Sequence, residues 1–231
     1  MSLLVCLDFD GTLAELNPDP YSVRIHPGAE RAIRRLAALP DTEVVILTGR
    51  HIEGIAKVLP ADFPVTVVGS HGAEPGPELT SADRAYLDDI EAQLRRIATD
   101  GAYVEVKPFQ RVLHVAQVDN EARATAILAE ANTIDTRGRP KTQGHNVVEF
   151  SAIDITKGTW LSAYKRRFDT TIFAGDDDTD EHAIAVLGPN DIGIKVGHKP
   201  TRATRRVPDV GAMAQFLTQL AEEREAWSAT R

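Results

Sequence analysis

The N-terminal stretch "SLLVCLDFDGTL" (residues 2–13) joins a nearly continuous apolar run to two carboxylates. Such a run suits a strand of a parallel sheet that is covered on both faces. Period two places Asp8 and Asp10 on the same side, and Gly11 lets nearby backbone N–H groups point at an incoming anion. One carboxylate can bind a cation and attack phosphorus while the other protonates the leaving oxygen. Ordinary turn chemistry after a strand is the alternative interpretation.

Strand and helix patterns alternate outward from this stretch. Further apolar runs predict strands at 42–50, 64–72, 170–177 and 191–197, and helical periodicity predicts helices at 26–39, 51–59, 154–168 and 212–223. Crossover helices must cover both faces of such a sheet, so we expect an α/β fold with a doubly wound, Rossmann-like parallel sheet. The chemistry should then lie at the carboxyl ends of the strands.

The pattern changes after "EPGPE", where two prolines and a glycine predict a boundary. Helices are then predicted at 81–99 and 121–131, and half-exposed antiparallel strands at 102–109, 111–118 and 146–150. We therefore expect a catalytic core formed by residues 1–77 and 154–231. Residues 78–153 would form a small α+β lid, of the C2 cap type, inserted into that core.

Composition excludes several classes of protein. The chain has 231 residues, 42% hydrophobic, and a net charge of −8, so we expect no nucleic-acid partner. Apolar stretches are short and the N-terminus has no leader-like pattern, so we expect no membrane partner and a cytoplasmic location. Cys6 is the only cysteine. A phosphatase thiolate usually has an arginine six positions on, where this chain has Thr12, so we expect a buried, structural Cys6.

Two further polar residues stand where chemistry is expected. Thr48 in "LTGR" follows the second strand, where its hydroxyl and a following amide can bind a phosphate oxygen. A helix N-cap is the alternative role for Thr48. Lys157 lies at a predicted helix start, where the helix dipole disfavours a cation, so an anionic ligand or a carboxylate should compensate. A solvated surface lysine is the alternative.

The segment "GDDDTDE" ends the fourth apolar run in like charges. An EF-hand loop would need glycine and glutamate where this chain has Glu181 and Leu187, so that interpretation fails. Asp178 and Glu181 have the spacing of a capping box at a helix start. Asp176 and Asp177 lie at the strand end, where several carboxylates stay ionised together only around a cation, and hard oxygen ligands favour Mg²⁺.

Taken together, "DFDGTL", "LTGR", Lys157 and "GDDDTDE" resemble the four motifs of the haloacid dehalogenase (HAD) superfamily of phosphohydrolases. The resemblance implies that Asp8 is the nucleophile and Asp10 the general acid/base. It also implies that Thr48 and Lys157 bind the phosphate and the covalent intermediate.

The same resemblance implies a set of metal ligands. Mg²⁺ would be bound by Asp8, by Asp176 and by the backbone of Asp10. Asp177 and Asp180 would be supporting acids beside that set.

Within the superfamily, "GSHGAE" after the third strand, the inserted lid and "GDDDTDEHA" are similar to trehalose-6-phosphate phosphatases. The resemblance implies a sugar phosphate substrate, with contacts from both parts of the chain. In the core we expect Gly11, Gly49, Arg50 and His71 to bind it, and in the lid Glu105, Lys107, His114 and Glu149. Solvated strand residues are the alternative for the lid positions. The family often has H-Y-R where this chain reads "HVA", so one common basic contact is missing.

We therefore expect a monomeric, Mg²⁺-dependent phosphatase that hydrolyses trehalose 6-phosphate to trehalose and phosphate through an aspartyl-phosphate. The nearest alternative is a phosphatase for another sugar or glycosyl-glycerate phosphate. A phosphomutase is a further alternative. A phospho-accepting signalling module also uses strand-end Asp, Thr and Lys, but it is about half this length and lacks a lid and the Asp8/Asp10 pair.

Overall fold

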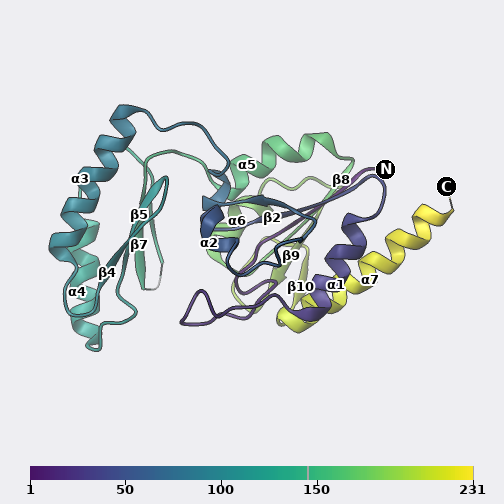
Figure 1. Cartoon of the computed structure of the whole chain (residues 1–231), viewed down its shortest axis with the longest axis horizontal. Helices are drawn as coiled ribbons and strands as arrows, with labels where there is room; N and C mark the ends of the chain where they lie inside the picture. Colours follow the sequence, from purple (N-terminus) through teal and green to yellow (C-terminus); the bar gives the residue numbers. More distant parts are fainter. Residues whose placement is uncertain (145, 231) are drawn as a thin grey trace. The chain divides into compact units, whose positions relative to one another are not determined.

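The computed structural model describes residues 1–144 and 146–230. The chain divides into two compact units, which we call the core unit (Met1–Pro75 and Ile155–Arg231) and the lid unit (Gly76–Asp154). Each unit has its own sheet (Figure 1) and its own hydrophobic core.

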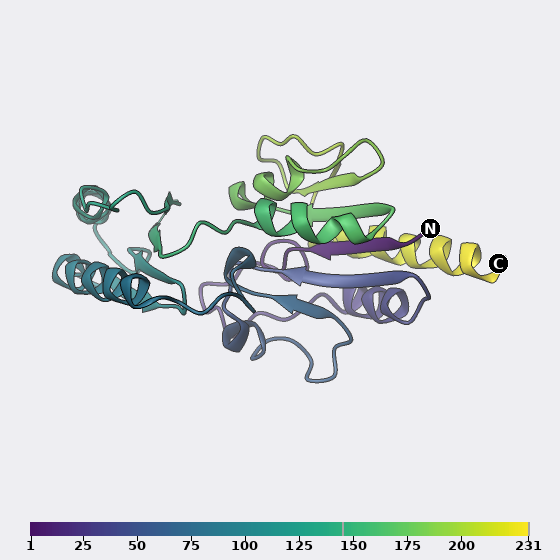
Figure 2. The same cartoon turned by 90° about the horizontal axis from the view of Figure 1, so that it is seen from above.

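The core unit is built on a six-stranded parallel sheet in the order β10-β9-β8-β1-β2-β3. The strands are β1 (Leu3–Leu7), β2 (Thr42–Leu47), β3 (Thr66–Val68), β8 (Thr170–Gly175), β9 (Ile192–Val196) and β10 (Arg205–Val207). The chain adds strands on one side of β1 and later on the other, so the strand order reverses between β1 and β8, and Leu7 pairs with Ala174 there. Figure 2 shows the purple strand β1 beside the blue strand β2. The predicted doubly wound sheet is confirmed, and this reversal point is where such sheets bind ligands.

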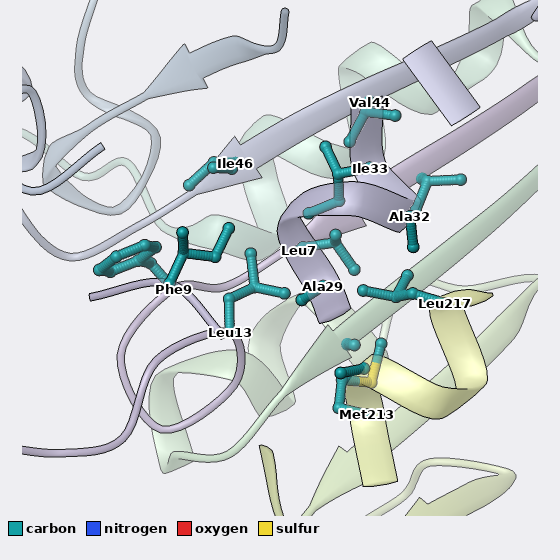
Figure 3. Close-up of a cluster of buried hydrophobic side chains, with 14 of the residues drawn as sticks. Leu7, Phe9, Leu13, Ala29, Ala32, Ile33, Val44, Ile46, Met213 and Leu217 are labelled. Atoms are coloured by element: carbon teal, nitrogen blue, oxygen red, sulfur yellow. The ribbon is translucent and has the colours of Figure 1, made fainter. Parts of the chain in front are cut away.

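Helices cover both faces of the core sheet, as the apolar strands require. They are α1 (Pro27–Ala37), α2 (Ile52–Ile55), α5 (Lys157–Tyr164), α6 (Asp178–Ile184) and α7 (Val210–Ala229), with short 3₁₀ turns η1 (Ser70–Gly72) and η2 (Lys165–Arg167). Alternate residues of β1 enter different cores: Leu7 packs with Ile33 of α1 and Leu217 of α7 (Figure 3). Cys6 packs instead with Leu161 of α5. Cys6 is fully buried and free, as expected.

The lid unit has a four-stranded antiparallel sheet in the order β4-β5-β7-β6. Its elements are α3 (Ser81–Ile97), β4 (Tyr103–Val106), β5 (Gln110–His114), α4 (Glu121–Asn132), β6 (Lys141–Gln143) and β7 (Val147–Ser151). Leu113, Val148 and Phe150 pack with α3 and α4 on one face. Since side chains alternate, Glu105 and Glu149 lie on the other face, each opposite Val112. The predicted separate antiparallel sheet is confirmed.

The expected capping pair at the start of α6 is wrong. The helix begins at Asp178, so its N-cap is Asp177, and the Asp177 N–H donates to Asp180 Oδ2 at 2.9 Å. Glu181 faces away from that cap and accepts hydrogen bonds from Lys195 Nζ and from the backbone of Arg202 instead. Lys195 is fully buried in β9, so it draws the Glu181 carboxylate to itself.

Three elements differ from the sequence pattern. The helix expected at 51–59 ends at Ile55, with Gly54 inside it and looser turns after it in which Lys57 and Val58 donate to carbonyls three residues back. Strands β6 and β10 were not predicted, because "KTQ" and "RRV" are short, mostly exposed and lack apolar alternation. Among the described helices, none has the length and apolar character that a bilayer crossing needs.

Candidate active site

Asp8 lies at the carboxyl end of β1 with both carboxylate oxygens engaged. Its backbone N–H donates to Ala174 O at 2.9 Å, which continues the pairing of β1 with β8. Asp8 Oδ1 accepts from Lys157 Nζ at 2.6 Å, and Oδ2 accepts from the Thr12 hydroxyl at 3.2 Å. The side chain is almost completely buried. Because the strand end and two donors fix this carboxylate, Asp8 has one defined position.

Lys157 links two carboxylates at the start of α5. Its ammonium group donates to Asp8 at 2.6 Å and to Asp180 Oδ1 at 2.7 Å. Burial by itself lowers the pKa of Lys157, but the charges of Asp180 and Asp8 outweigh it, so that pKa lies above its usual value. Lys157 is therefore a buried cation held by two acids, and the alternative of a solvated surface lysine is wrong.

Asp176 follows β8 and packs against the loop after β1. A Cβ on Gly11 would lie 2.4 Å from Asp176 Cγ, and Gly11 has φ +74°, so this position requires glycine twice over. Burial, with the charges of Asp180 and Asp177, raises the pKa of Asp176 to about 6. Within the described part of the chain, no donor bonds to the Asp176 carboxylate. Its charge is therefore poorly compensated by the protein.

The carboxylates at this edge of the sheet fit a divalent cation. Asp8, Asp176 and Asp180 each offer an oxygen, and these oxygens lie within 4.8 Å of one another. Such hard oxygen donors suit Mg²⁺, which also keeps several waters. Asp180, expected as a supporting acid, belongs to this cluster, but Lys157 and the Asp177 N–H already occupy its two oxygens. A cation bound here would thus supply the positive charge that the protein does not place beside the Asp176 carboxylate.

Asp10 makes a different set of contacts from Asp8. Its two oxygens accept from Arg50 Nε and Nη2, both at 2.7 Å. The Arg50 side chain is 13% exposed and that of Asp10 29%, so the pair is partly screened from water. The structure gives the side chain of Asp10 an arginine partner, while Asp8 has a lysine.

The turn after β2 brings together the residues expected to bind phosphate. Thr48 is buried, and its hydroxyl accepts from the Arg50 N–H at 3.1 Å. The N-cap of α2 is His51, so the alternative role of Thr48 as that cap is wrong. A Cβ on Gly49 would lie 2.5 Å from the ring of His71, whose own φ is 58°. The four expected substrate contacts of the core unit, counting Gly11, therefore lie on three turns, which follow the neighbouring strands β1, β2 and β3.

In the lid unit, the four expected residues form two pairs on the sheet face opposite α3 and α4. His114 Nε2 lies 2.8 Å from Glu105 Oε2, and Lys107 Nζ lies 3.2 Å from Glu149 Oε2. The ring of Tyr103 stacks on His114 with centroids 4.7 Å apart. Each of these four side chains thus has a polar partner within the set, and their role in binding a substrate stays a prediction.

Three residues near the core site were not anticipated. Thr12 contacts Asp8, and Lys199 pairs with Asp177. Lys195, fully buried in β9, donates to Asp177 O at 3.1 Å and to Glu181 Oε1 at 3.3 Å. A lysine within the apolar run "IGIKVG" was the available indication of this role, since an unpaired charge is not tolerated inside a sheet.

Comparison with known sequences bears on this site. The sequence model of the family described as trehalose-phosphatase matches residues 6–210, a span that contains all the residues of both groups above. The chain belongs to the trehalose-phosphatase family. Trehalose-phosphatases are phosphoric monoester hydrolases, so the resemblance inferred from the four motifs is confirmed.

Individual trehalose-phosphatase relatives match nearly the whole chain. The trehalose-6-phosphate phosphatase of Escherichia coli is 29% identical and aligns with 94% of this chain and 87% of its own length. The bifunctional trehalose-6-phosphate synthase/phosphatase of Thermoproteus tenax is 31% identical over 94% of this chain. The chain spans only 32% of that longer relative.

Solved structures agree on the fold. A trehalose-6-phosphate phosphatase related protein superposes with a TM-score of 0.75 at 26% identity, covering 95% of this chain and 97% of its own. A sugar phosphatase of HAD subclass IIB superposes with a TM-score of 0.62 at 15% identity, covering 95% and 99%. The HAD fold is thereby confirmed for this member of the trehalose-phosphatase family.

Proposed function

We propose that this protein is a Mg²⁺-dependent phosphatase that hydrolyses trehalose 6-phosphate to trehalose and inorganic phosphate. The observation that carries the proposal is the largely buried cluster in which Asp8 and Asp176, at the adjacent ends of β1 and β8, lie beside Lys157 and Asp180 from the first turns of α5 and α6. Membership of the trehalose-phosphatase family and the names of the relatives support the choice of substrate.

In the first step, Asp8 attacks the phosphorus of the ester. Lys157 holds Oδ1, and the Thr12 contact at 3.2 Å leaves Oδ2 the more weakly held oxygen. As the new Asp8 O–P bond forms, the bond from phosphorus to the sugar oxygen breaks, and Asp10 gives that oxygen a proton. The products are free sugar and an aspartyl-phosphate on Asp8.

In the second step, water replaces Asp8 on phosphorus. Asp10, now ionised, takes a proton from the water, and the water oxygen forms the new bond to phosphorus. The bond to Asp8 breaks, which restores its carboxylate and releases inorganic phosphate. We propose that the Thr48 hydroxyl and the N–H of Gly49 bind the phosphate oxygens during both steps.

A bound Mg²⁺ would be held by Asp8 and Asp176, with the backbone of Asp10 as a further ligand. It would neutralise charge on the phosphoryl oxygens, whose repulsion from the carboxylates otherwise opposes the attack. Lys157 contributes a second positive charge beside Asp8 and keeps that carboxylate in place.

The lid unit supplies the groups that would recognise the sugar. The Glu105–His114 and Lys107–Glu149 pairs combine donors and acceptors on one face of a sheet, which is what hydroxyl groups of a disaccharide need. We propose that these pairs select the sugar, while the core unit performs phosphoryl transfer.

The test is phosphate release from trehalose 6-phosphate, sucrose 6-phosphate and mannosylglycerate phosphate, each with and without Mg²⁺. We expect trehalose 6-phosphate to be turned over fastest and only with the metal. Equal or faster turnover of another ester would contradict the substrate. Movement of the phosphate to another position of the sugar, with none released, would indicate a phosphomutase. A phosphorylated protein that persists for hours without releasing phosphate would indicate a signalling module.

The nucleophile has its own test. Asp8→Asn should lower phosphate release by on the order of 10⁴-fold or more, since removing the nucleophile removes the covalent route. Far-UV circular dichroism should show an unchanged fold. Mass spectrometry after acid quenching should find a phosphoryl group on Asp8 of the wild-type chain, which would support the intermediate. A phosphoryl group on another residue instead would contradict it.

A further inference from the structure

We infer that Arg50 is a positioning residue for Asp10, holding the carboxylate of the general acid/base in place, and is not a ligand of the substrate phosphate. This inference rests on the proposed function, because it takes Asp10 as the group that protonates the leaving oxygen. It replaces the expectation that Arg50 binds substrate directly.

The contacts of the Arg50 guanidinium group carry the inference. Nε and Nη2 donate to the two oxygens of Asp10, both at 2.7 Å, and Nη1 donates to Pro20 O at 2.6 Å. A bidentate pair of this kind fixes the plane of the carboxylate as well as its position. Three of the five N–H groups of the guanidinium, one on each nitrogen, are therefore engaged by the protein, and the fork that could grip an oxyanion with two parallel bonds is taken up by Asp10.

The backbone of Arg50 is anchored as firmly as its side chain. Its N–H donates to Thr48 Oγ1 at 3.1 Å, and its carbonyl accepts from the Ser70 N–H at 2.7 Å. The guanidinium carbon also lies 5.8 Å from the centre of the Phe9 ring. Because both ends of the side chain are held, Arg50 can transmit the position of the phosphate-binding turn to Asp10.

This arrangement leaves Asp10 able to work. A carboxylate has about four acceptor positions, and the arginine fork occupies two of them, one on each oxygen. Each Asp10 oxygen therefore keeps one position, which in the first step carries the proton that Asp10 donates to the leaving oxygen and in the second accepts a proton from water. Loss of Arg50 should then weaken proton transfer specifically, while leaving the phosphate-binding groups in place.

The leaving group separates the two roles of Arg50. A sugar alkoxide departs only with a proton, whereas p-nitrophenolate is a weak base that departs without one. Because general-acid catalysis contributes about 10²–10⁴-fold, Arg50→Gln should lower kcat/KM for trehalose 6-phosphate by about 10- to 100-fold. For p-nitrophenyl phosphate we expect a change below about 3-fold. Arg50→Lys, which restores charge but not the fork, should recover only part of the loss.

The ratio of the two activities, measured on one preparation, does not depend on how much of the protein is folded. Arg35→Gln is the matched control, because Arg35 makes another bidentate pair, with Glu225, between α1 and α7. It should leave the ratio unchanged. An equal loss on both esters after Arg50→Gln would overturn the inference and indicate a phosphate ligand.

A double-mutant cycle provides a second test. If Arg50 acts through Asp10, Arg50→Gln should have little further effect on trehalose 6-phosphate turnover in an Asp10→Asn background. The same loss in both backgrounds would overturn the inference. If the wild-type enzyme prefers another sugar phosphate, the proposed substrate is wrong but the role of Arg50 is still open to the test. The ratio of activities is then measured with that sugar phosphate in place of trehalose 6-phosphate.

Discussion

The carboxyl end of β1 in the core unit and the polar face of the lid sheet both carry paired charges, but they hold them differently. In the core unit the charged groups are buried, Lys157 serves two acids at once, and glycine with positive φ is required beside them. In the lid unit the charged groups include two side-chain pairs along one face of the sheet, and these groups are partly exposed. The core site is therefore a rigid assembly, and the lid face is a set of pairs that can be exchanged one at a time.

Among substitutions that act through packing, the one at Gly11 gives the largest expected effect on the rigid side of this comparison. In Gly11→Ala the new Cβ would overlap the Asp176 carboxylate at 2.4 Å and would have to adopt φ +74°. We expect kcat/KM to fall by about 100-fold or more, because an error of about 1 Å in a catalytic group is enough for that loss. Mg²⁺ affinity, measured by titration calorimetry, should weaken in parallel.

Gly138→Ala separates strain from overlap. Gly138 has φ +78°, close to that of Gly11, but its Cβ would meet nothing within 4 Å. This variant should show only the modest instability of an alanine at positive φ, with activity unchanged. Equal effects of the two substitutions on activity would contradict the close packing of Asp176 on the loop after β1.

The buried lysine of β9 gives the next largest effect. Lys195→Met keeps the unbranched apolar stem of the side chain but removes the donor to Asp177 O and Glu181 Oε1. Breaking a buried ion pair typically costs about 3–5 kcal/mol, and Glu181 is partly exposed, so we expect about 3 kcal/mol from urea unfolding. Lys199→Met removes an exposed pair with Asp177 and should cost less than about 1 kcal/mol. Equal losses would show that burial does not distinguish these lysines.

Features that depend on strand order were predictable from the sequence, and features that depend on individual side-chain contacts were not. The core sheet and its site were predictable because each strand is a continuous apolar run that ends in a polar motif, so topology alone brings Asp8, Lys157 and Asp176 together. The Asp10–Arg50 pair was not predictable, since no local pattern shows which way two side chains on separate turns point. The cap of α6 was misassigned because Asp177–Asp180 and Asp178–Glu181 have the same spacing, and the buried Lys195 decides between them.

Asp176 should make the stability of the core unit depend on pH. Its pKa is raised to about 6, so the folded protein binds this proton more tightly than the unfolded chain does. The resulting stabilisation is complete below about pH 4 and is lost as the pH rises through about 6. In Mg²⁺-free protein, the free energy of unfolding should therefore fall across this range by at most about 3 kcal/mol.

Substitutions show whether Asp176 is the source of that slope. Asp176→Asn should remove the decrease measured by urea unfolding at several pH values, and Asp178→Asn, an exposed neighbour, should retain it. Added Mg²⁺ should stabilise the wild-type protein most at the higher pH, where Asp176 is ionised, and should do little for Asp176→Asn. A slope that persists in Asp176→Asn would assign the titration to another group.

The smallest expected effect lies on the lid face. Lys107→Met breaks the pair with Glu149 but leaves the sheet intact, since neither group belongs to the apolar side packed on α3 and α4. We expect KM for trehalose 6-phosphate to rise about 10-fold, which corresponds to one lost charge-assisted hydrogen bond to a sugar hydroxyl. Turnover of p-nitrophenyl phosphate, which has no sugar, should be unchanged, and Arg95→Met, at an exposed pair of α3, should affect neither ester. A fall in p-nitrophenyl phosphate turnover would show that Lys107 acts on the phosphate, and the separation of sugar recognition from phosphoryl transfer would then fail.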